Sequence, residues 1–156
     1  MAAEISLSQE LAFVEQYLAI EQTRLGEKLR VEMSISPNTR DAVIPSMLLQ
    51  PLVENAVRHG VAPSIEGGTV AIATTIHDDC LLMTIRNSGP RTAAATVGNK
   101  ASNGIGLTNT AERLRTSYGD DQRFLARSLA DGGYEATIEI PFRKAGPSAE
   151  GAVCAR

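Results

Sequence analysis

The sequence predicts a two-layer α/β (α+β) sandwich in which helices cover one face of a single sheet. Several short segments alternate apolar and polar residues, as strands with one buried face do, and longer segments carry an apolar stripe with helical spacing. The chain has 156 residues, 43% of them hydrophobic and 21% charged, which is the size and composition of one globular domain.

The predicted strands share a period of two. Residues 29–36, 70–76, 81–85 and 134–140 alternate clearly, and residues 122–129 do so less regularly. Asp78-Asp79 is predicted as the hairpin turn between the second and third of these strands. Strands with one apolar face form a sheet that is covered on one side only, which gives the two layers.

A first helix is predicted from the capping box of Ser6 and Gln9 to Leu25, before Gly26. Its apolar residues form one narrow stripe, and polar residues cover its other faces. The stripe is Leu7, Leu11, Val14, Leu18 and Leu25, and the polar residues are Glu10, Glu15, Gln16, Glu21 and Arg24. A stripe this narrow can pack on the domain or against a partner helix, and the sequence leaves both open.

Two further helices should cover the sheet. One is predicted to begin at Pro45 and to end at His59 before Gly60, and it is apolar over most of its circumference. The other is predicted over residues 105–118, closed by Gly119.

Composition excludes several classes of function. No run approaches the ~18 apolar residues of a membrane span, and no signal peptide is recognisable at the start. The net charge of −3 argues against nucleic acid as a partner. The cysteines, Cys80 and Cys154, are too few for a structural zinc site, and as free thiols they indicate the cytoplasm.

Asn55 is the first candidate for chemistry, because it interrupts a helix that is otherwise mostly apolar. Arg58 and His59 follow at spacings of three and four, on the same helix face. An amide oxygen beside a cation and an imidazole suits a metal-bound polyphosphate. The alternative is a solvent-facing polar stripe with a surface ion pair between Glu54 and Arg58.

Asn87 ends the inward-facing row of its strand, directly before Ser88-Gly89. It could read the hydrogen-bonding edge of a ligand, or it could simply form a turn at the strand end. Residues 88–103 follow without periodicity, as in a lid or binding loop.

Gly104-Ile105-Gly106-Leu107 stands where the last helix is predicted to begin, so its backbone N–H groups could face an anion. It is neither a dinucleotide-binding fingerprint nor a Walker loop. The alternative is a flexible hinge at a helix start.

In this order, the elements resemble the ATP-binding domain of sensor histidine kinases, in the GHKL (HATPase_c) superfamily, and the LytS-type kinases in particular. PSMLLQPLVENAVRHGV (45–61) is similar to the N-box of that subgroup, including a helix-interior Gln50-Pro51. GIGLTNTAERLRTSYG (104–119) is similar to its G2 box and the helix that follows. Residues 6–35 resemble the segment that joins the phosphoacceptor helices to this domain, so the resemblance covers residues 6–142.

The resemblance implies a Bergerat fold, whose sheet is mixed and mostly antiparallel with helices on one face. It divides the chain into a linker or dimerisation-proximal helix (1–28) and an ATP-binding domain (29–142). The remaining residues, 143–156, are rich in Gly, Ala, Pro and Ser and are predicted to be a disordered tail.

The resemblance also implies roles for individual residues. Asn55 would coordinate Mg2+ on the phosphates of ATP, and Arg58 and His59 would approach the phosphates or the ribose. Gly104, Ile105, Gly106 and Leu107 would offer backbone N–H groups to the phosphates. Residues 88–103 would form the lid, in which Lys100 is a further candidate for a phosphate contact.

The sequence departs from the family pattern at the G1 box, which normally reads Asp-x-Gly-x-Gly. Here Asn87-Ser88-Gly89-Pro90 replaces the Asp that accepts a hydrogen bond from the adenine amino group. An Asn carbonyl still accepts that bond, without the strength of a charged partner. Tyr134 stands where relatives carry Thr. Pro51 replaces an acidic or amide residue, which leaves Glu54 as the nearby carboxylate and no assigned catalytic base.

The Pro-His-Phe motif of the phosphoacceptor is absent, so the chain is expected to be a fragment or a stand-alone module. The partners implied are the phosphoacceptor and dimerisation helices of the same kinase and a LytTR-type response regulator. A dimeric full-length protein anchored in the inner membrane, with this domain in the cytoplasm, is expected by resemblance. The alternatives are a non-catalytic GHKL regulatory or dimerisation module with a degenerate G1 box, and an anti-sigma-type protein serine kinase.

Overall fold

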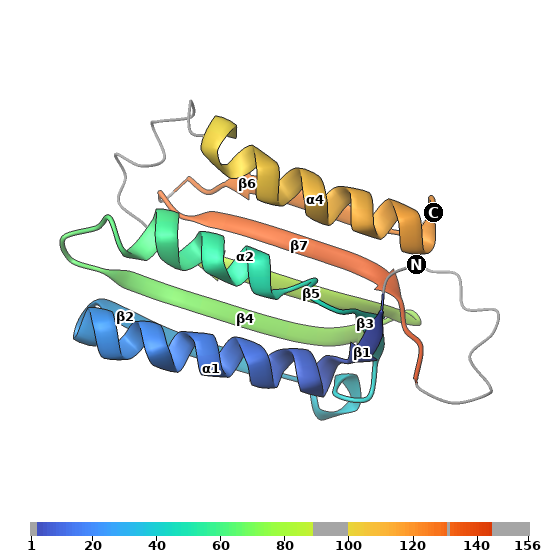
Figure 1. Cartoon of the computed structure of the whole chain (residues 1–156). Helices are drawn as coiled ribbons and strands as arrows, with labels where there is room; N and C mark the ends of the chain where they lie inside the picture. Colours follow the sequence, from blue (N-terminus) through green and yellow to red (C-terminus); the bar gives the residue numbers. More distant parts are fainter. Residues whose placement is uncertain (1–2, 89–99, 131, 145–156) are drawn as a thin grey trace.

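The computed structural model describes residues 3–88, 100–130 and 132–144, and for 100–106 it describes only the course of the backbone. Three helical segments lie side by side on one face of a five-stranded sheet (Figure 1). The predicted two-layer arrangement is thereby confirmed. Among the described residues, no helix is both long and apolar enough to cross a membrane.

The strands are β2 (Leu29–Ile35), β4 (Gly68–His77), β5 (Cys80–Asn87), β6 (Arg123–Ser128) and β7 (Tyr134–Pro141), in the spatial order β2-β4-β5-β7-β6. β2 and β4 pair in parallel, and every other pairing in this sheet is antiparallel. The sheet is thus mixed and mostly antiparallel, as expected.

The hairpin between β4 and β5 turns at Asp78 and Asp79, whose φ angles are 52° and 64°. Asp and Asn adopt this left-handed conformation more readily than most residues, which confirms the predicted turn. Cys80, which follows the turn, is buried and disulfide-bonded, so the expectation of free thiols is wrong.

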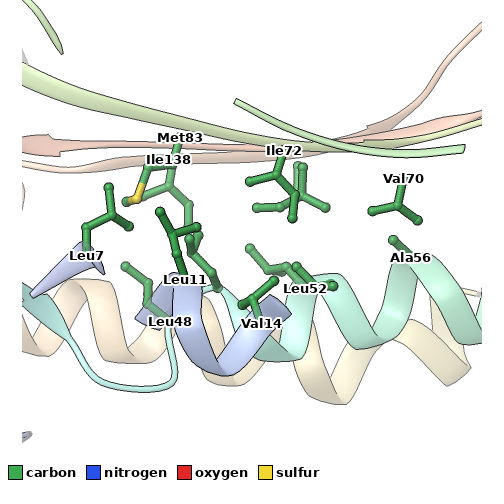
Figure 2. Close-up of a cluster of buried hydrophobic side chains, with 14 of the residues drawn as sticks. Leu7, Leu11, Val14, Leu48, Leu52, Ala56, Val70, Ile72, Met83 and Ile138 are labelled. Carbon is green, nitrogen blue, oxygen red and sulfur yellow. The ribbon is translucent and has the colours of Figure 1, made fainter. Parts of the chain in front are cut away.

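Helix α1 (Leu7–Leu25) begins at the predicted capping box and ends at Gly26, which has a φ of 63°. The stripe residues Leu7, Leu11, Val14 and Leu18 are buried in the same core as the sheet. Figure 2 shows Leu7, Leu11 and Val14 facing side chains of the sheet. The question that the sequence left open is answered: the stripe packs on the domain. The boundary between residues 28 and 29 stays a prediction.

The expected helix start at Pro45 is wrong. Pro45 ends a short strand, β3 (Val43–Pro45), which pairs antiparallel with β1 (Glu4–Ser6). Helix α2 spans only Gln50–Asn55, with Pro51 in its first turn rather than in a helix interior. Proline is tolerated there because first-turn N–H groups have no partner within the helix.

The helix does not stop at His59 either. It continues from α2 as η3 (Ala56–Val61), a π-helical turn that includes Gly60. Two 3-10 turns, η1 (Gly26–Lys28) and η2 (Pro37–Thr39), flank β2.

Helix α4 (Lys100–Tyr118) ends before Gly119, as predicted, but starts well before Ile105. The predicted loop over 88–103 is therefore wrong from Lys100 onward. Glycine is a poor helix former, by about 1 kcal/mol relative to alanine, so Gly104 and Gly106 had favoured a later start.

Candidate functional site

The segment α2–η3 carries Asn55, Arg58 and His59 between the other two helices (Figure 1). Asn55 is half-buried at the end of α2, and its neighbours Val53, Ala56 and Val57 belong to the core. Because α2 packs against α4 and η3 packs on β4 and β5, this segment lies at the junction of the elements that the sequence analysis singled out.

The alternative of a surface ion pair between Glu54 and Arg58 is not observed among the described residues. Glu54 is half-buried and accepts a hydrogen bond from Gln50 Nε2 at 3.4 Å, whereas Arg58 is exposed. Glu54 also faces α1, where burial and the carboxylates of Glu21 and Glu54 raise the pKa of Tyr17. A catalytic role for Glu54 remains a prediction.

The π-helical turn carries Arg58 and His59. Its wide hydrogen bond runs from the Ala62 N–H to the Val57 carbonyl at 2.8 Å, and Lys28 Nζ donates to the Ala62 carbonyl at 3.1 Å. Such turns occur frequently at functional sites. Lys28 is suited to its place because a cation stabilises the negative end of a helix.

His59 is half-buried in this turn. Burial, and after it the neighbouring Arg58 guanidinium, lowers the pKa of His59 below its ordinary value. His59 therefore offers a neutral imidazole near pH 7, and Arg58 supplies the permanent positive charge.

Asn87 ends β5 with only 5% of its surface exposed, opposite Val70 on β4 and Tyr134 on β7. It is paired within the sheet, so its inward direction is confirmed and the turn-forming alternative is not needed. Its Nδ2 donates to the Ser88 carbonyl at 3.4 Å. Burial also raises the pKa of Tyr134.

Gly60 lies where the helical segment that carries Asn55 meets the strand end that carries Asn87. A Cβ built on Gly60 would lie 2.1 Å from Asn87 Nδ2 and 2.6 Å from its Cγ. Only a residue without a side chain allows η3 to approach the end of β5 this closely. Gly60 was expected to end the helix, but its function is this close packing.

Ser88, expected to begin the lid, is anchored to β4. Its N–H donates to the Thr69 carbonyl at 3.0 Å, and its Oγ accepts from the Thr69 N–H at 2.9 Å. Gly89 and the following residues to 99 lie outside the described residues.

The G2 segment does not lie at the mouth of a helix. Lys100 is the first residue of α4, and Gly104, Ile105, Gly106 and Leu107 lie beyond its first turn. Only the first four N–H groups of a helix lack intrahelical partners. Phosphate contacts from Gly104 to Leu107 would therefore require α4 to begin further along the chain.

A protein-built metal cage is not found in the described part of the chain, which has no group of three or more His, Cys, Asp or Glu residues. The donor set instead fits Mg2+, which is often held by one or two protein oxygens together with substrate phosphates. Asn55 and Glu54 both carry half-buried side-chain oxygens on this segment, and the amide of Asn55 is the predicted ligand.

Sequence reasoning missed two polar residues that hold α2 in place. Glu10 was expected on an outer face of α1, but it is buried with 0% exposure. Arg113 on α4 was not singled out, although its Nη2 donates to the Ser46 carbonyl. The position of Glu10 beside the apolar stripe, three residues after Leu7 and four before Val14, was the available signal.

The sequence and the fold of this chain were compared with those of known proteins. No protein-family model matches the chain. The sensor histidine kinase YpdA of Escherichia coli is 35% identical over 122 residues, covering 75% of this chain and 21% of YpdA. The sensor protein LytS of Enterococcus faecalis is 26% identical over 148 residues, covering 90% of this chain and 25% of LytS.

Two solved structures share the fold. The catalytic domain of histidine kinase ThkA aligns with a TM-score of 0.62 and 17% identity, covering 90% of this chain and 95% of that one. Full-length ShkA in complex with AMPPNP aligns with a TM-score of 0.66 and 18% identity, covering 94% of this chain and 32% of ShkA.

The fold is therefore that of histidine kinase catalytic domains. In sequence the chain is similar to sensor histidine kinases, LytS among them, over as much as 90% of its length, which confirms the resemblance. It spans about a quarter of the length of the curated relatives that it matches, from 21% of YpdA to 25% of LytS.

Proposed function

We propose that this chain is the ATP-binding catalytic domain of a two-component sensor histidine kinase. It binds Mg2+-ATP and donates the γ-phosphate to a histidine on a domain outside this chain. The observation that best supports this proposal is the close contact between Gly60 and Asn87. It brings the helical segment of Asn55 next to the strand end whose Asn87 is expected to hydrogen-bond to adenine. The complex of ShkA with AMPPNP supports a nucleotide as the ligand.

The residue roles follow the chemistry of the side chains. Asn55 contributes an amide oxygen to Mg2+, and Arg58 and His59 contact the phosphates or the ribose. Asn87 accepts a hydrogen bond from the adenine amino group, next to Gly89. Lys100 and the backbone of Gly104, Ile105, Gly106 and Leu107 complete the phosphate contacts in a bound form in which α4 begins further along the chain.

The chain's contribution to phosphoryl transfer is positioning and charge compensation. Mg2+ supplies neutralisation of the phosphate charge when it is bound. Arg58 adds a fixed cation, and neutral His59 donates or accepts a hydrogen bond without adding charge. The nucleophile is the imidazole nitrogen of the absent phosphoacceptor helix, which displaces ADP from the γ-phosphorus.

The partners follow from this role. They are the phosphoacceptor and dimerisation helices of the same kinase and a response regulator of the LytTR type. The full-length protein is a dimer anchored in the inner membrane, and this domain lies in the cytoplasm.

Titration with labelled ATP tests the binding step. We expect saturable binding that strengthens when Mg2+ is added, and N55A should remove the Mg2+-dependent part. N109A is the matched control, because Asn109 is an exposed amide on α4. Absence of saturable binding at millimolar ATP contradicts the proposal, and Mg2+-dependent binding by N55A contradicts the role of Asn55.

Transfer is tested by adding a phosphoacceptor fragment in trans, with a copy lacking the acceptor histidine as control. Acid-labile phosphate on the intact fragment supports the proposal. ATP binding without transfer favours the non-catalytic module, the alternative that the replacement of Asp by Asn87 leaves open. Acid-stable phosphate on serine favours the anti-sigma-type kinase.

A further inference from the structure

Glu10 on α1 is a fully buried carboxylate that holds the segment before α2. Its Oε1 accepts from the Met47 N–H at 3.0 Å, and its Oε2 accepts from the Leu49 and Gln50 N–H groups at 3.0 and 3.1 Å. A buried carboxylate is costly unless it is hydrogen-bonded, and these three bonds satisfy it. Glu10 is therefore a buried structural residue that binds the segment before α2, and it is not a surface residue of α1.

The start of α2 depends on a partner of this kind. Leu49 occupies the N-cap position, and no side chain of the cap accepts a hydrogen bond from the helix. Glu10 supplies the missing acceptor from another helix, and its negative charge lies at the positive end of α2. It also holds Met47, whose φ of 62° is unfavourable for a residue with a side chain.

Arg113 on α4 holds the same segment from the other side. Its Nη2 donates to the Ser46 carbonyl, and the Ser46 N–H donates to the Ala3 carbonyl at 2.9 Å. The segment Ser46–Gln50 is therefore tied to α1, to α4 and to the chain just before β1.

Asn55 follows Gln50 by five residues, a rise of about 7.5 Å along the helix axis. α2 continues directly as η3, so the bonds at Gln50 fix the start of the helical segment that carries Asn55, in addition to the core packing of Leu52 and Val53. Tyr17 and Glu54 provide a second place where α1 faces α2, one residue before Asn55.

We propose that Glu10 and Arg113 are positioning residues of the nucleotide site, which place Asn55 by clamping the segment Ser46–Gln50. The inference rests on the proposed function for its effect on ATP, but the clamp itself is a property of the free protein. It makes Mg2+-dependent binding depend on α1, which contains no proposed ligand contact.

The test compares E10Q and R113Q with T39V. E10Q keeps the size of the side chain but removes its charge and one acceptor oxygen. T39V breaks the buried hydroxyl pair of Thr39 and Thr74, 2.8 Å apart, which does not touch the segment Ser46–Gln50. It therefore controls for a general loss of stability.

We expect E10Q and R113Q to weaken Mg2+-ATP binding about tenfold, as loss of a residue that orients a metal ligand does. ATP binding without Mg2+ should change less, because Asn87 is not displaced, and T39V should bind like wild type. An E10Q affinity equal to wild type overturns the proposal. The proposal is also overturned if T39V loses as much Mg2+-ATP affinity as E10Q when the two variants have the same melting temperature. If E10Q fails to fold, R113Q decides by the same criterion.

Hydrogen exchange separates this proposal from the proposed function. In free E10Q, the amides of α2 and η3 should exchange faster than in wild type, while those of β4 and β5 should not. Unchanged exchange in α2 and η3 overturns the clamp. If wild-type protein does not bind ATP, the proposed function fails, and the exchange result alone then decides whether the clamp positions α2.

Discussion

Gly60 of η3 and Asn87 of β5 are packed so closely that a methyl group on Gly60 would lie 2.1 Å from Asn87 Nδ2. Asn87 is 5% exposed and belongs to the sheet, so it has little room to move away. The helical segment that carries Asn55 is therefore held against the end of β5, where Asn87 is proposed to contact adenine.

Substitution of Gly60 tests this packing. G60A should lower the free energy of unfolding by about 1–3 kcal/mol, because overpacking forces side chains or backbone to shift. Urea unfolding measures the loss. In the double variant G60A/N87A the clash is removed, so part of the stability should return. A G60A protein as stable as wild type would mean that the contact is looser than described.

Restoring a carboxylate at position 87 should strengthen adenine binding. N87D replaces a neutral acceptor by a charged one, which should tighten ATP binding by about 1 kcal/mol, or roughly fivefold. The free protein should become less stable, because the new carboxylate is almost fully buried. Calorimetric titration measures the affinity, and inosine triphosphate, which lacks the amino group, is the control. An equal gain for both nucleotides would show that residue 87 does not contact the amino group.

Alanine substitution in the G2 segment tests the course of α4. If the helix of the free protein includes Gly106, G106A should stabilise it by up to about 1 kcal/mol. The same change should weaken ATP binding, because phosphate contacts require this part of the backbone to leave the helix. Thermal unfolding with and without ATP measures both effects. Stabilisation with unchanged affinity would place the phosphates elsewhere.

The titration of His59 should appear in the pH dependence of stability. Its pKa in the folded protein lies below the ordinary value of 6.5, so the unfolded chain takes up the proton first as the pH falls. Stability should be complete above pH 6.5, should fall below it, and should level off below the folded pKa. The effect should be small, because His59 is only half-buried.

Substitution of Arg58 tests the cause of the lowered pKa of His59. R58Q removes one of the two causes of the shift, so the pKa of His59 should rise toward 6.5 in an NMR titration, although burial keeps it lowered. A pKa that does not move would mean that burial alone accounts for the shift.

The packing of α1 predicts that residues 1–28 do not form a separable unit. Leu11 is 1% exposed, and L11A should lower the free energy of unfolding by about 2.7–5 kcal/mol. Ile20 on the same helix is 65% exposed, so I20A should change it by less than about 0.5 kcal/mol. A chain beginning at Leu29 should lose cooperative unfolding. Retention of a sharp transition would support a domain boundary at 28/29.

The elements that could be predicted from the sequence are those whose cause is local. The capping box of Ser6 and Gln9 lies within one helical turn, and Asp78-Asp79 forms its turn with its own backbone. The period of two decides which residues of a strand face the core, so the inward direction of Asn87 was also available. These determinants act over a few residues, and no distant contact can easily reverse them.

The rest was decided by the tertiary structure. Pro45 lies in a strand because β1, about forty residues earlier in the sequence, pairs with it. Glu10 is buried because its carboxylate meets the amides before α2, and Gly60 is needed because Asn87 occupies the space of its side chain. Each of these contacts joins residues far apart in the chain, and hydrophobic periodicity holds no information about where a buried polar group will find its partner.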